Sequence, residues 1–353
     1  MISIISLLLA VTLWESGDIG PTVELEQVTG SVLNEPSPPV GSIAPAPGGG
    51  VMLLTWGSGE PFRLKDPESG EAVSMDGIAP PVVYFGGGDR FAIMVNPESG
   101  SVILNDDGKV RHRFSLRALN PIGGAIIAGD RLFVLGLAQS GDLRTGAGER
   151  LGKCLLVSVP LLDNDPRAEE SVCGDVPVEV AAWSIYAGGH LRRDPRGVYA
   201  VWDGSPELYV LDNGGRLVRK IRIAEGSDIP PAVTMADRAR VLREQGGYFI
   251  HRSRYRWAQG TLAVPGGGFA VLFREPASRD NAFTMDIYSE AGDRLVRSLP
   301  MDLGLQSAGT FARPVTLSDG RQYILVVQTD ETYRSVKAQR FHRVRFAQPS
   351  AKK

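Results

Sequence analysis

The feature that most constrains the fold is a repeated pair of short hairpins, each built around a glycine-containing turn. In one kind of hairpin, apolar stretches flank the turn, as in residues 43–54, 191–202 and 261–273. A second kind follows most of these, as in residues 101–114 and 208–223, with Asp-Asp-Gly or Asp-Asn-Gly-Gly at its centre. Asp-Gly and Asn-Gly between apolar stretches are strong hairpin signals. Each unit is therefore predicted to contain four short antiparallel strands.

Six such units recur along the chain, and repeated four-stranded units are typical of β-propellers. The two turn glycines of a unit lie about 20 residues apart, as do Gly88 and Gly108, and units recur at about 40 residues where no insertion intervenes. Glycine and proline supply 42 and 24 of the 353 residues, which suits a chain with many turns. We predict an all-β, six-bladed β-propeller of four-stranded antiparallel blades. A seventh unit around the longest insertion is the alternative.

The last unit contains only three clear strands, the third of which ends near Phe346. Its missing outer strand is expected from residues 22–28, where Val23, Leu25 and Gln27 alternate with other residues in the period of a strand. Such a closure would remove the open sheet edge between the last blade and the first, and open edges invite aggregation.

One unit also carries a resemblance to a known class of proteins. Residues 191–202 read Leu-Arg-Arg-Asp-Pro-Arg-Gly-Val-Tyr-Ala-Val-Trp, and residues 208–223 follow them as the second hairpin. Together they resemble one repeat of the NHL-repeat-like and TolB-like six-bladed propellers of bacterial extracytoplasmic proteins. The resemblance extends over most of the chain as a pattern and is close in this unit alone. It implies a fold rather than an activity, because propellers of this class serve as scaffolds, lactonases, lyases and binding modules.

The chain is predicted to comprise a signal-peptide-like segment over residues 1–17, one propeller over residues 18–347 and a frayed tail over residues 348–353. Residues 2–14 are apolar except for Ser and Thr, too short for a spanning helix of about 20 residues but suited to a signal-peptide core. No Lys or Arg precedes Arg63, which a true start codon further upstream would explain. We predict export to the periplasm or exterior of a bacterial cell, with no transmembrane span in the mature chain. The alternative is an N-terminal strand buried in the fold.

The two cysteines of the chain, Cys154 and Cys173, flank a predicted hairpin whose turn centres on Asp163 and Asn164. In this register position 154 lies opposite position 173, close enough for a disulfide. In an exported protein such a bond would stabilise the fold by about 3 kcal/mol. The alternative is two separate reduced thiols in a cytosolic protein.

Two long insertions mark one face of the predicted propeller as the place for a site. Residues 138–152 and 224–257 connect strands on the same face, whereas most turns on the other face are tight. Elaborated loops on a rigid scaffold are where binding sites tend to lie. We therefore expect the binding surface on this face, a short helix over residues 235–245 within the longer insertion, and further contacts from residues that directly follow second strands.

The longer insertion ends in His-Arg-Ser-Arg-Tyr-Arg-Trp, residues 251–257, a basic stretch that alternates in the period of a strand. This pattern predicts three arginines on one side and two aromatic rings on the other. Guanidinium groups suit a carboxylate, a phosphate or an acidic glycan. The alternative is that the arginines pair with neighbouring acids or face water. The predicted binding residues are Arg252, Arg254, Tyr255, Arg256, Trp257, Trp202, Asp203, Arg274 and Glu275.

The sequence contains no motif that assigns a catalytic residue: G-x-S-x-G and Walker A loops are missing, and the four histidines fall in different units. We therefore predict a noncatalytic scaffold without a cofactor that binds a protein or an anionic small ligand or glycan. One alternative is a hydrolase or lactonase that uses a divalent metal such as Ca²⁺ in the central channel, with Asn96, Asp203, Glu275 and Asp330 as ligands. A second is a structural subunit of an assembly. The net charge of −2 argues against nucleic acid and anionic membranes as partners.

Overall fold

Every described strand belongs to one of six four-stranded antiparallel sheets in the computed structural model of the chain. The structure describes residues 22–28, 40–45, 51–55, 63–65, 72–74, 83–87, 92–96, 101–106, 109–115, 119–129, 131–138, 153–160, 169–171, 189–202, 205–226, 253–277, 282–305, 310–317, 320–329 and 336–347. Between residues 40 and 115, and between residues 153 and 171, it describes only the backbone of the strands.

Five of the sheets, or blades, consist of four strands that follow one another along the chain. Blade 1 contains β2 (Val40–Pro45), β3 (Val51–Thr55), β4 (Arg63–Lys65) and β5 (Ala72–Ser74). Blade 2 contains β6 (Val83–Gly87), β7 (Ala92–Asn96), β8 (Ser101–Asp106) and β9 (Lys109–Ser115). Blade 3 contains β10 (Leu119–Ala128), β11 (Arg131–Ala138), β12 (Lys153–Pro160) and β13 (Glu169–Ser171). Blade 4 contains β14 (Gly189–Asp194), β15 (Gly197–Trp202), β16 (Glu207–Leu211) and β17 (Leu217–Arg222). Blade 5 contains β18 (Trp257–Ala263), β19 (Phe269–Arg274), β20 (Phe283–Tyr288) and β21 (Arg294–Pro300).

Blade 6 is completed by the N-terminal strand, as the sequence predicts. It contains β22 (Thr310–Thr316), β23 (Gln322–Thr329), β24 (Val336–Ala347) and β1 (Thr22–Val28), and β1 pairs with the outer edge of β24. The register places Leu25 opposite Val344. Both Val23 and Leu25 pack on the core between blades 5 and 6, which fixes β1 by apolar burial as well as by the backbone ladder.

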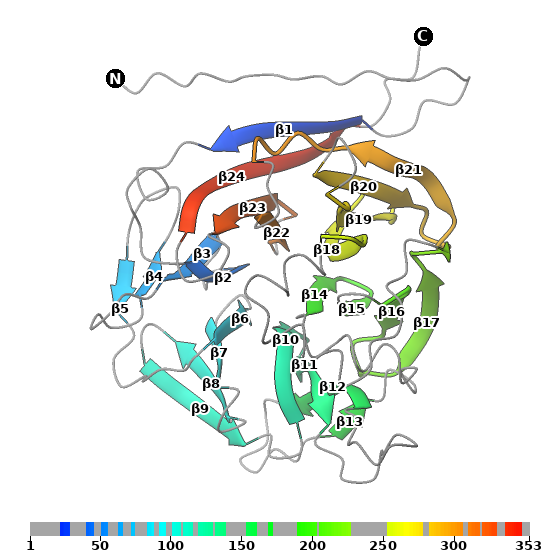
Figure 1. The fold of residues 1–353 in the computed structure, drawn as a ribbon. Coiled ribbons are helices and arrows are strands. Elements are labelled where there is room, and N and C mark those ends of the chain that lie inside the picture. Colours follow the sequence, from blue (N-terminus) through cyan, green and yellow to red (C-terminus); the bar gives the residue numbers. More distant parts are fainter. Residues whose placement is uncertain are drawn as a thin grey trace, which may run out of the picture.

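The innermost strands form a closed ring. They contact one another in the order β2, β6, β10, β14, β18, β22 and back to β2. Figure 1 shows the blades arranged radially around a common axis, with these strands nearest to it. Four-stranded antiparallel sheets in this arrangement define a β-propeller, so the predicted fold class is confirmed. The alternative of a seventh unit around the longest insertion is not tested by the described residues, and the expected helix over residues 235–245 lies outside them.

The described core lies between neighbouring blades. Alternate residues of a strand face opposite sides, so blades 4 and 5 each present one apolar face to the blade before and another to the blade after. Between blades 4 and 5, Phe269 is stacked on Tyr288 with ring centroids 4.9 Å apart and tilted against Tyr199 at 5.4 Å. Between blades 5 and 6 the core includes Leu272 and Ile324, both fully buried.

A glutamine side chain of blade 6 bonds to the backbone of the inner strand of blade 5. The amide of Gln322 in β23 donates from Nε2 to the carbonyl oxygen of Ala263 at 2.7 Å and accepts from the Ala263 N–H at 2.6 Å. Inner strands have one edge without a neighbouring strand, and buried backbone groups need partners. A side-chain amide supplies both a donor and an acceptor, so Gln322 replaces one step of the missing ladder.

The hairpin with the cysteines adopts the register that the disulfide prediction assumed. In the pairing of β12 with β13, Leu156 lies opposite Ser171 and Ser158 lies opposite Glu169. Cys173 and the side chain of Cys154 are outside the described residues, so the disulfide stays a prediction. The signal-like segment, residues 1–17, and the C-terminal tail, residues 348–353, are also outside them. Within the described part of the chain, no helix is long and apolar enough to span a membrane.

Candidate functional site

The guanidinium group of Arg256 is a buried charge that is paired with two buried carboxylates. Arg256 directly follows the turn at residues 253–255 and precedes β18, so it lies where the longer insertion re-enters the fold. Its side chain is fully buried between blades 4 and 5 and stacks over the ring of Phe273 at 3.7 Å. The predicted strand alternation over residues 251–257 is wrong here, because residues 253–255 form a turn and both Arg256 and Trp257 are buried.

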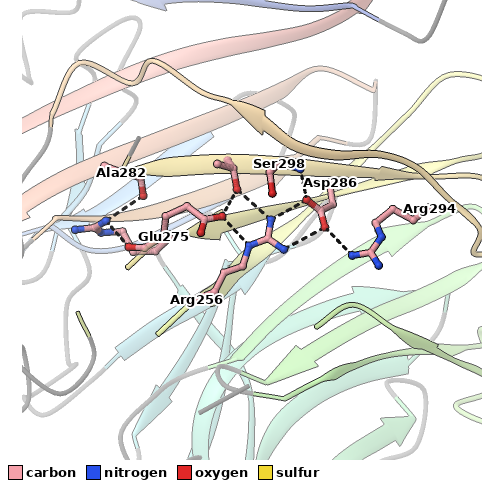
Figure 2. A network of polar contacts seen from close by, with 8 residues as sticks. Arg256, Glu275, Ala282, Asp286, Arg294 and Ser298 are labelled. Carbon is pink, nitrogen blue, oxygen red and sulfur yellow. Dashed lines mark hydrogen bonds and ion pairs between the residues drawn. The ribbon is translucent and has the colours of Figure 1, made fainter. Parts of the chain in front are cut away.

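Two carboxylates hold this guanidinium group (Figure 2). Arg256 Nε donates to Glu275 Oε1 at 2.7 Å, and Nη2 donates to Asp286 Oδ1 at 2.7 Å. Nη1 reaches Asp286 Oδ2 at 3.2 Å, and Nη2 also donates to Thr284 Oγ1 at 3.0 Å. The hydroxyl of Thr284 in turn makes a short hydrogen bond to Glu275 Oε1. Each of the three guanidinium nitrogens thus donates to at least one acceptor, as a buried charge requires.

The charge of Arg256 is kept by this arrangement. Burial would lower the pKa of Arg256, but the hydrogen bonds and charges of Asp286 and Glu275 outweigh burial and raise the pKa above its ordinary value. Asp286 also accepts a 2.7 Å hydrogen bond from the backbone N–H of Ser298, a non-glycine residue with a φ of +53°. The same carboxylate therefore stabilises the strained backbone of β21 at Ser298 and forms the ion pair with Arg256.

Two further ion pairs connect the buried Asp286 to the exposed Glu225 through Arg294. Arg294 Nη1 lies 3.6 Å from Asp286 Oδ2, and Arg294 Nη2 lies 3.3 Å from Glu225 Oε1. Glu225 follows β17 at the start of the longer insertion, whereas Arg256 stands at its end. This series of ion pairs, which we call the charge relay, thus joins both ends of that insertion. Its members, in order, are Glu225, Arg294, Asp286, Arg256 and Glu275. Opposite charges alternate along it, so each interior member has a partner on either side.

Arg274 fixes the loop between β19 and β20 by a different means. Its Nη1 donates to the carbonyl oxygens of Glu275 at 2.7 Å and Ala282 at 3.0 Å, the two residues on either side of that loop. Its Nε donates to the carbonyl oxygen of Thr310 in blade 6 at 3.2 Å. Arg274 therefore ties the two ends of that loop to each other and to β22.

The predicted binding residues divide into buried and exposed groups. Five of them are at most 8% exposed and act inside the protein: Trp202, Arg256, Trp257, Arg274 and Glu275. Of the rest, Arg254 is exposed and Tyr255 is half-buried. Arg252 and Asp203 lie outside the described residues. The structure thus brings Arg256 and Glu275 together as an ion pair, which corresponds to the alternative that the arginines pair with neighbouring acids.

The alternative set of metal ligands is described only in part. Asp203 and Asp330 lie outside the described residues, and for Asn96 only the backbone is described. Glu275 directs one carboxylate oxygen at Arg256 and Thr284, so a cation already holds it. Among the described residues, no group of three or more His, Cys, Asp or Glu side chains is placed to hold a metal ion.

Asp286 and Arg294 are members of the relay that the sequence analysis missed. Asp286 is the one charged residue in the otherwise apolar or uncharged strand Phe283–Tyr288, and it is completely buried. A carboxylate inside such a strand requires a buried cation, which is the signal that could have revealed it. Arg294 carries no such signal, because an arginine at the start of an outer strand is ordinary.

Comparison with known proteins supports the fold. No protein-family model matches the sequence, and no curated protein matches it significantly. A solved structure of a member of the DUF4221 family from Bacteroides vulgatus is 10% identical, with a TM-score of 0.54 over 96% of this chain and 98% of its own. A streptogramin B lyase is 8% identical, with a TM-score of 0.48 over 92% of this chain and 98% of its own. Regucalcin from Agrobacterium tumefaciens, a calcium-binding protein, is 12% identical, with a TM-score of 0.46 over 88% of this chain and 93% of its own. The likeness to the first of these defines the chain as a β-propeller.

Proposed function

We propose that the protein is an exported, noncatalytic propeller scaffold that binds an acidic ligand or an acidic protein surface. The binding face is the one that carries the insertions over residues 138–152 and 224–257. The observation that supports this proposal most directly is the charge relay, because it ties both ends of the longer insertion to one buried carboxylate, Asp286.

Burying the charge relay carries a large desolvation free energy. The attraction between the charges offsets this free energy only where the geometry of the ion pairs is good, and an apolar cluster of the same size would often stabilise the folded protein as much. Charges with fixed partners specify position more sharply than apolar contacts do. The relay therefore suits a loop whose ends must be held in place, as a binding loop on a rigid scaffold requires.

The chemistry of the partner follows from the residues that remain exposed. Arg256 is neutralised by Glu275 and Asp286, so it contributes no charge to the surface. Arg254 is exposed two residues earlier, and Arg252 is the further arginine of the same stretch. Guanidinium groups at a surface recognise carboxylates and phosphates through paired hydrogen bonds. An acidic glycan or an acidic peptide is accordingly the class of partner that we propose.

The proposal is tested by binding to alginate, a polyuronate, and to poly-glutamate, at two salt concentrations. The double variant R252A/R254A should bind each probe about tenfold more weakly than the parent, because two charge-assisted contacts are lost. The matched control is R216A/R345A, which removes the same charge from two exposed arginines outside this stretch, one of them at the turn before β17.

Equal loss of binding in both double variants would show that net charge, not the loop, attracts the probe. Absence of binding by the parent to either polyanion, at low salt and at 0.15 M salt, would contradict the proposed acidic partner. Thermal unfolding of all variants provides the check on folding, and both double variants should unfold within about 2 °C of the parent because Arg254, Arg216 and Arg345 are exposed.

A further inference from the structure

Strand β1 closes blade 6 from the outside and is paired along one edge. In the order of the sheet its neighbour is β24, and no other described strand is bonded to it. Figure 1 shows β1 at the rim of the propeller, outside β24. The ring of innermost strands is closed by the contact of β22 with β2, which does not involve β1. Strand β1 can therefore separate from β24 without opening the ring.

The apolar side chains of β1 are half-buried, unlike those of strands nearer to the axis. Val23 and Leu25 pack on the core between blades 5 and 6, and Val28 packs on the opposite face of blade 6. In β23, by comparison, Ile324 and Val326 are fully buried. Segments that bury little apolar surface open at a lower free energy than the whole molecule. We therefore expect β1 to separate from β24 before the propeller unfolds.

Strands β1 and β24 carry opposite charges. β1 contains two glutamates and no Lys or Arg, whereas β24 contains four Lys or Arg residues and no acidic residue. The register places Glu24 opposite Arg345 and Glu26 opposite Arg343. Glu26 Oε2 also accepts a hydrogen bond from Arg345 Nη2 at 3.0 Å. Opposite charges stabilise an antiparallel pair of strands and like charges destabilise it, so the edge of β24 is complementary to an acidic strand.

The other outer strands do not suit this edge. Strands β9, β17 and β21, the outer strands of blades 2, 4 and 5, contain Lys or Arg and no acidic residue. The outer strand of blade 1, β5, is uncharged, and the acidic β13 of blade 3 has three residues. Two β24 edges would likewise bring cations against cations. Among the described strands, β1 is thus the one whose charge and length suit β24.

A second copy of the chain supplies the same acidic strand. Each copy has one β1 and one β24 edge, so reciprocal exchange forms the same contacts twice in a closed two-fold dimer. Residues 29–39 connect β1 to β2 and can span up to about 40 Å when fully extended. Because β1 already lies at the rim, this length suffices to place it against the rim of an adjacent copy.

We propose that blade 6 is a site of strand exchange, at which β1 of one copy pairs with β24 of a second copy and the reverse. Pairing within one chain through a short connection corresponds to an effective concentration in the millimolar range. The dimer should therefore be minor at about 10 µM and substantial at about 1 mM. Strand exchange is separate from the loop-face binding proposed above and does not depend on it.

The test uses two full-length variants with complementary charges. E24R/E26R places cations opposite Arg343 and Arg345, and R343E/R345E places anions opposite Glu24 and Glu26. In either variant alone, β1 faces like charges whether it pairs within its chain or with an identical copy. In a mixed dimer with exchanged strands, opposite charges meet at both β24 edges.

The two chains are combined in urea and refolded together at about 100 µM, below the effective concentration of pairing within one chain. Size-exclusion chromatography with light scattering measures the dimer, and mass spectrometry of the dimer fraction gives its composition. The mixture should contain at least about tenfold more dimer than either variant alone, with one copy of each chain in each dimer. The variant E24R/E26R/R343E/R345E regains opposite charges within one chain and should be as monomeric as the parent.

The matched control is R196E mixed with E290R. Arg196 and Glu290 form an exposed ion pair between turns of blades 4 and 5, and neither turn lies in an exchangeable terminal strand. Because exchange of β1 cannot restore this pair, the control mixture should contain no more dimer than its two components.

A mixture of the β1 and β24 variants that stays monomeric up to about 1 mM would overturn the proposal. Equal amounts of dimer in the mixture and in one variant alone would also overturn it, because the sheet edges would then associate without exchange. If a double variant does not fold, E26R and R345E replace the two, with the same expected direction. Polyanion binding is measured on other variants, so its failure and the failure of strand exchange are distinguishable.

Discussion

Arg256 and Arg254 are two residues apart in the chain but lie in opposite environments. The Arg256 side chain is fully buried between two carboxylates, whereas Arg254 is exposed. Removing one partner of a buried ion pair leaves the other charges without compensation, whereas removing a surface charge changes little. The same substitution at the two positions therefore has very different consequences.

We expect R256M to lower the free energy of unfolding by about 3–5 kcal/mol, because Glu275 and Asp286 remain buried without their cation. R254M, its matched control, should change the free energy by less than about 0.5 kcal/mol. Urea unfolding followed by tryptophan fluorescence measures both values. A loss below 1 kcal/mol in R256M would mean that water or another cation reaches the two carboxylates.

His342 gives the fold a dependence on pH. It is 4% exposed in β24, its Nε2 has no hydrogen-bond partner among the protein atoms, and burial lowers its pKa to about 4, against the partial compensation of a hydrogen bond to the backbone of Leu303. Between about pH 6.5 and pH 4 the unfolded chain therefore binds a proton that the folded chain does not bind. Stability falls as the pH is lowered through this interval, by up to about 3 kcal/mol.

Unfolding in urea at pH 7.5 and at pH 4.5 measures this effect. We expect the parent to lose more stability between the two pH values than H342Q does, because glutamine does not titrate. Parallel losses in the two proteins would assign the pH dependence to other groups.

At the scale of elements, strands and turns could be predicted from the sequence, because hairpin signals are local. The turn before Gly197 shows why: a Cβ atom at this position would collide with the carbonyl oxygen of Leu211, so glycine marks the turn in sequence and in structure. The register of β12 with β13 and the pairing of β1 with β24 were predicted in the same way, from alternation and counting.

The candidate site could not be predicted in the same way, because its contacts are not local. Arg256 meets Asp286, 30 residues away, and Arg294 of blade 5 meets Glu225, which follows blade 4. The basic stretch was recognised, but alternation was applied to residues 253–255, where the structure has a turn. Whether an arginine faces water or a buried carboxylate depends on the packing of blade against blade, which a single chain segment does not encode.

For the whole molecule, β1 decides whether the ring of blades is closed at its outer edge. A truncated chain that starts at residue 29 lacks the contacts of Val23 and Leu25 and exposes the backbone edge of β24. We expect it to unfold at a lower temperature and to form oligomers in size-exclusion chromatography, because an unpaired edge strand accepts other chains. A chain that starts at residue 22 keeps β1 and is the control.

If both truncated chains remain monomeric and unfold at the same temperature, β1 contributes nothing to closure. If both aggregate, the segment before residue 22 is responsible instead of the strand.

The pairing of β1 with β24 also sets the order of events during synthesis. Glu26 and Arg345 are 319 residues apart in the chain and lie 3.0 Å from each other in the folded protein. Because synthesis proceeds from the N-terminus, β1 is the first of the described strands to be made and its partner is the last of them. Residues 22–28 therefore lack their hydrogen-bonding partner, β24, until the other described strands have been synthesised. Blade 6 can therefore be completed only once β24 has been synthesised, which makes its closure the pairing with the greatest sequence separation in the described fold.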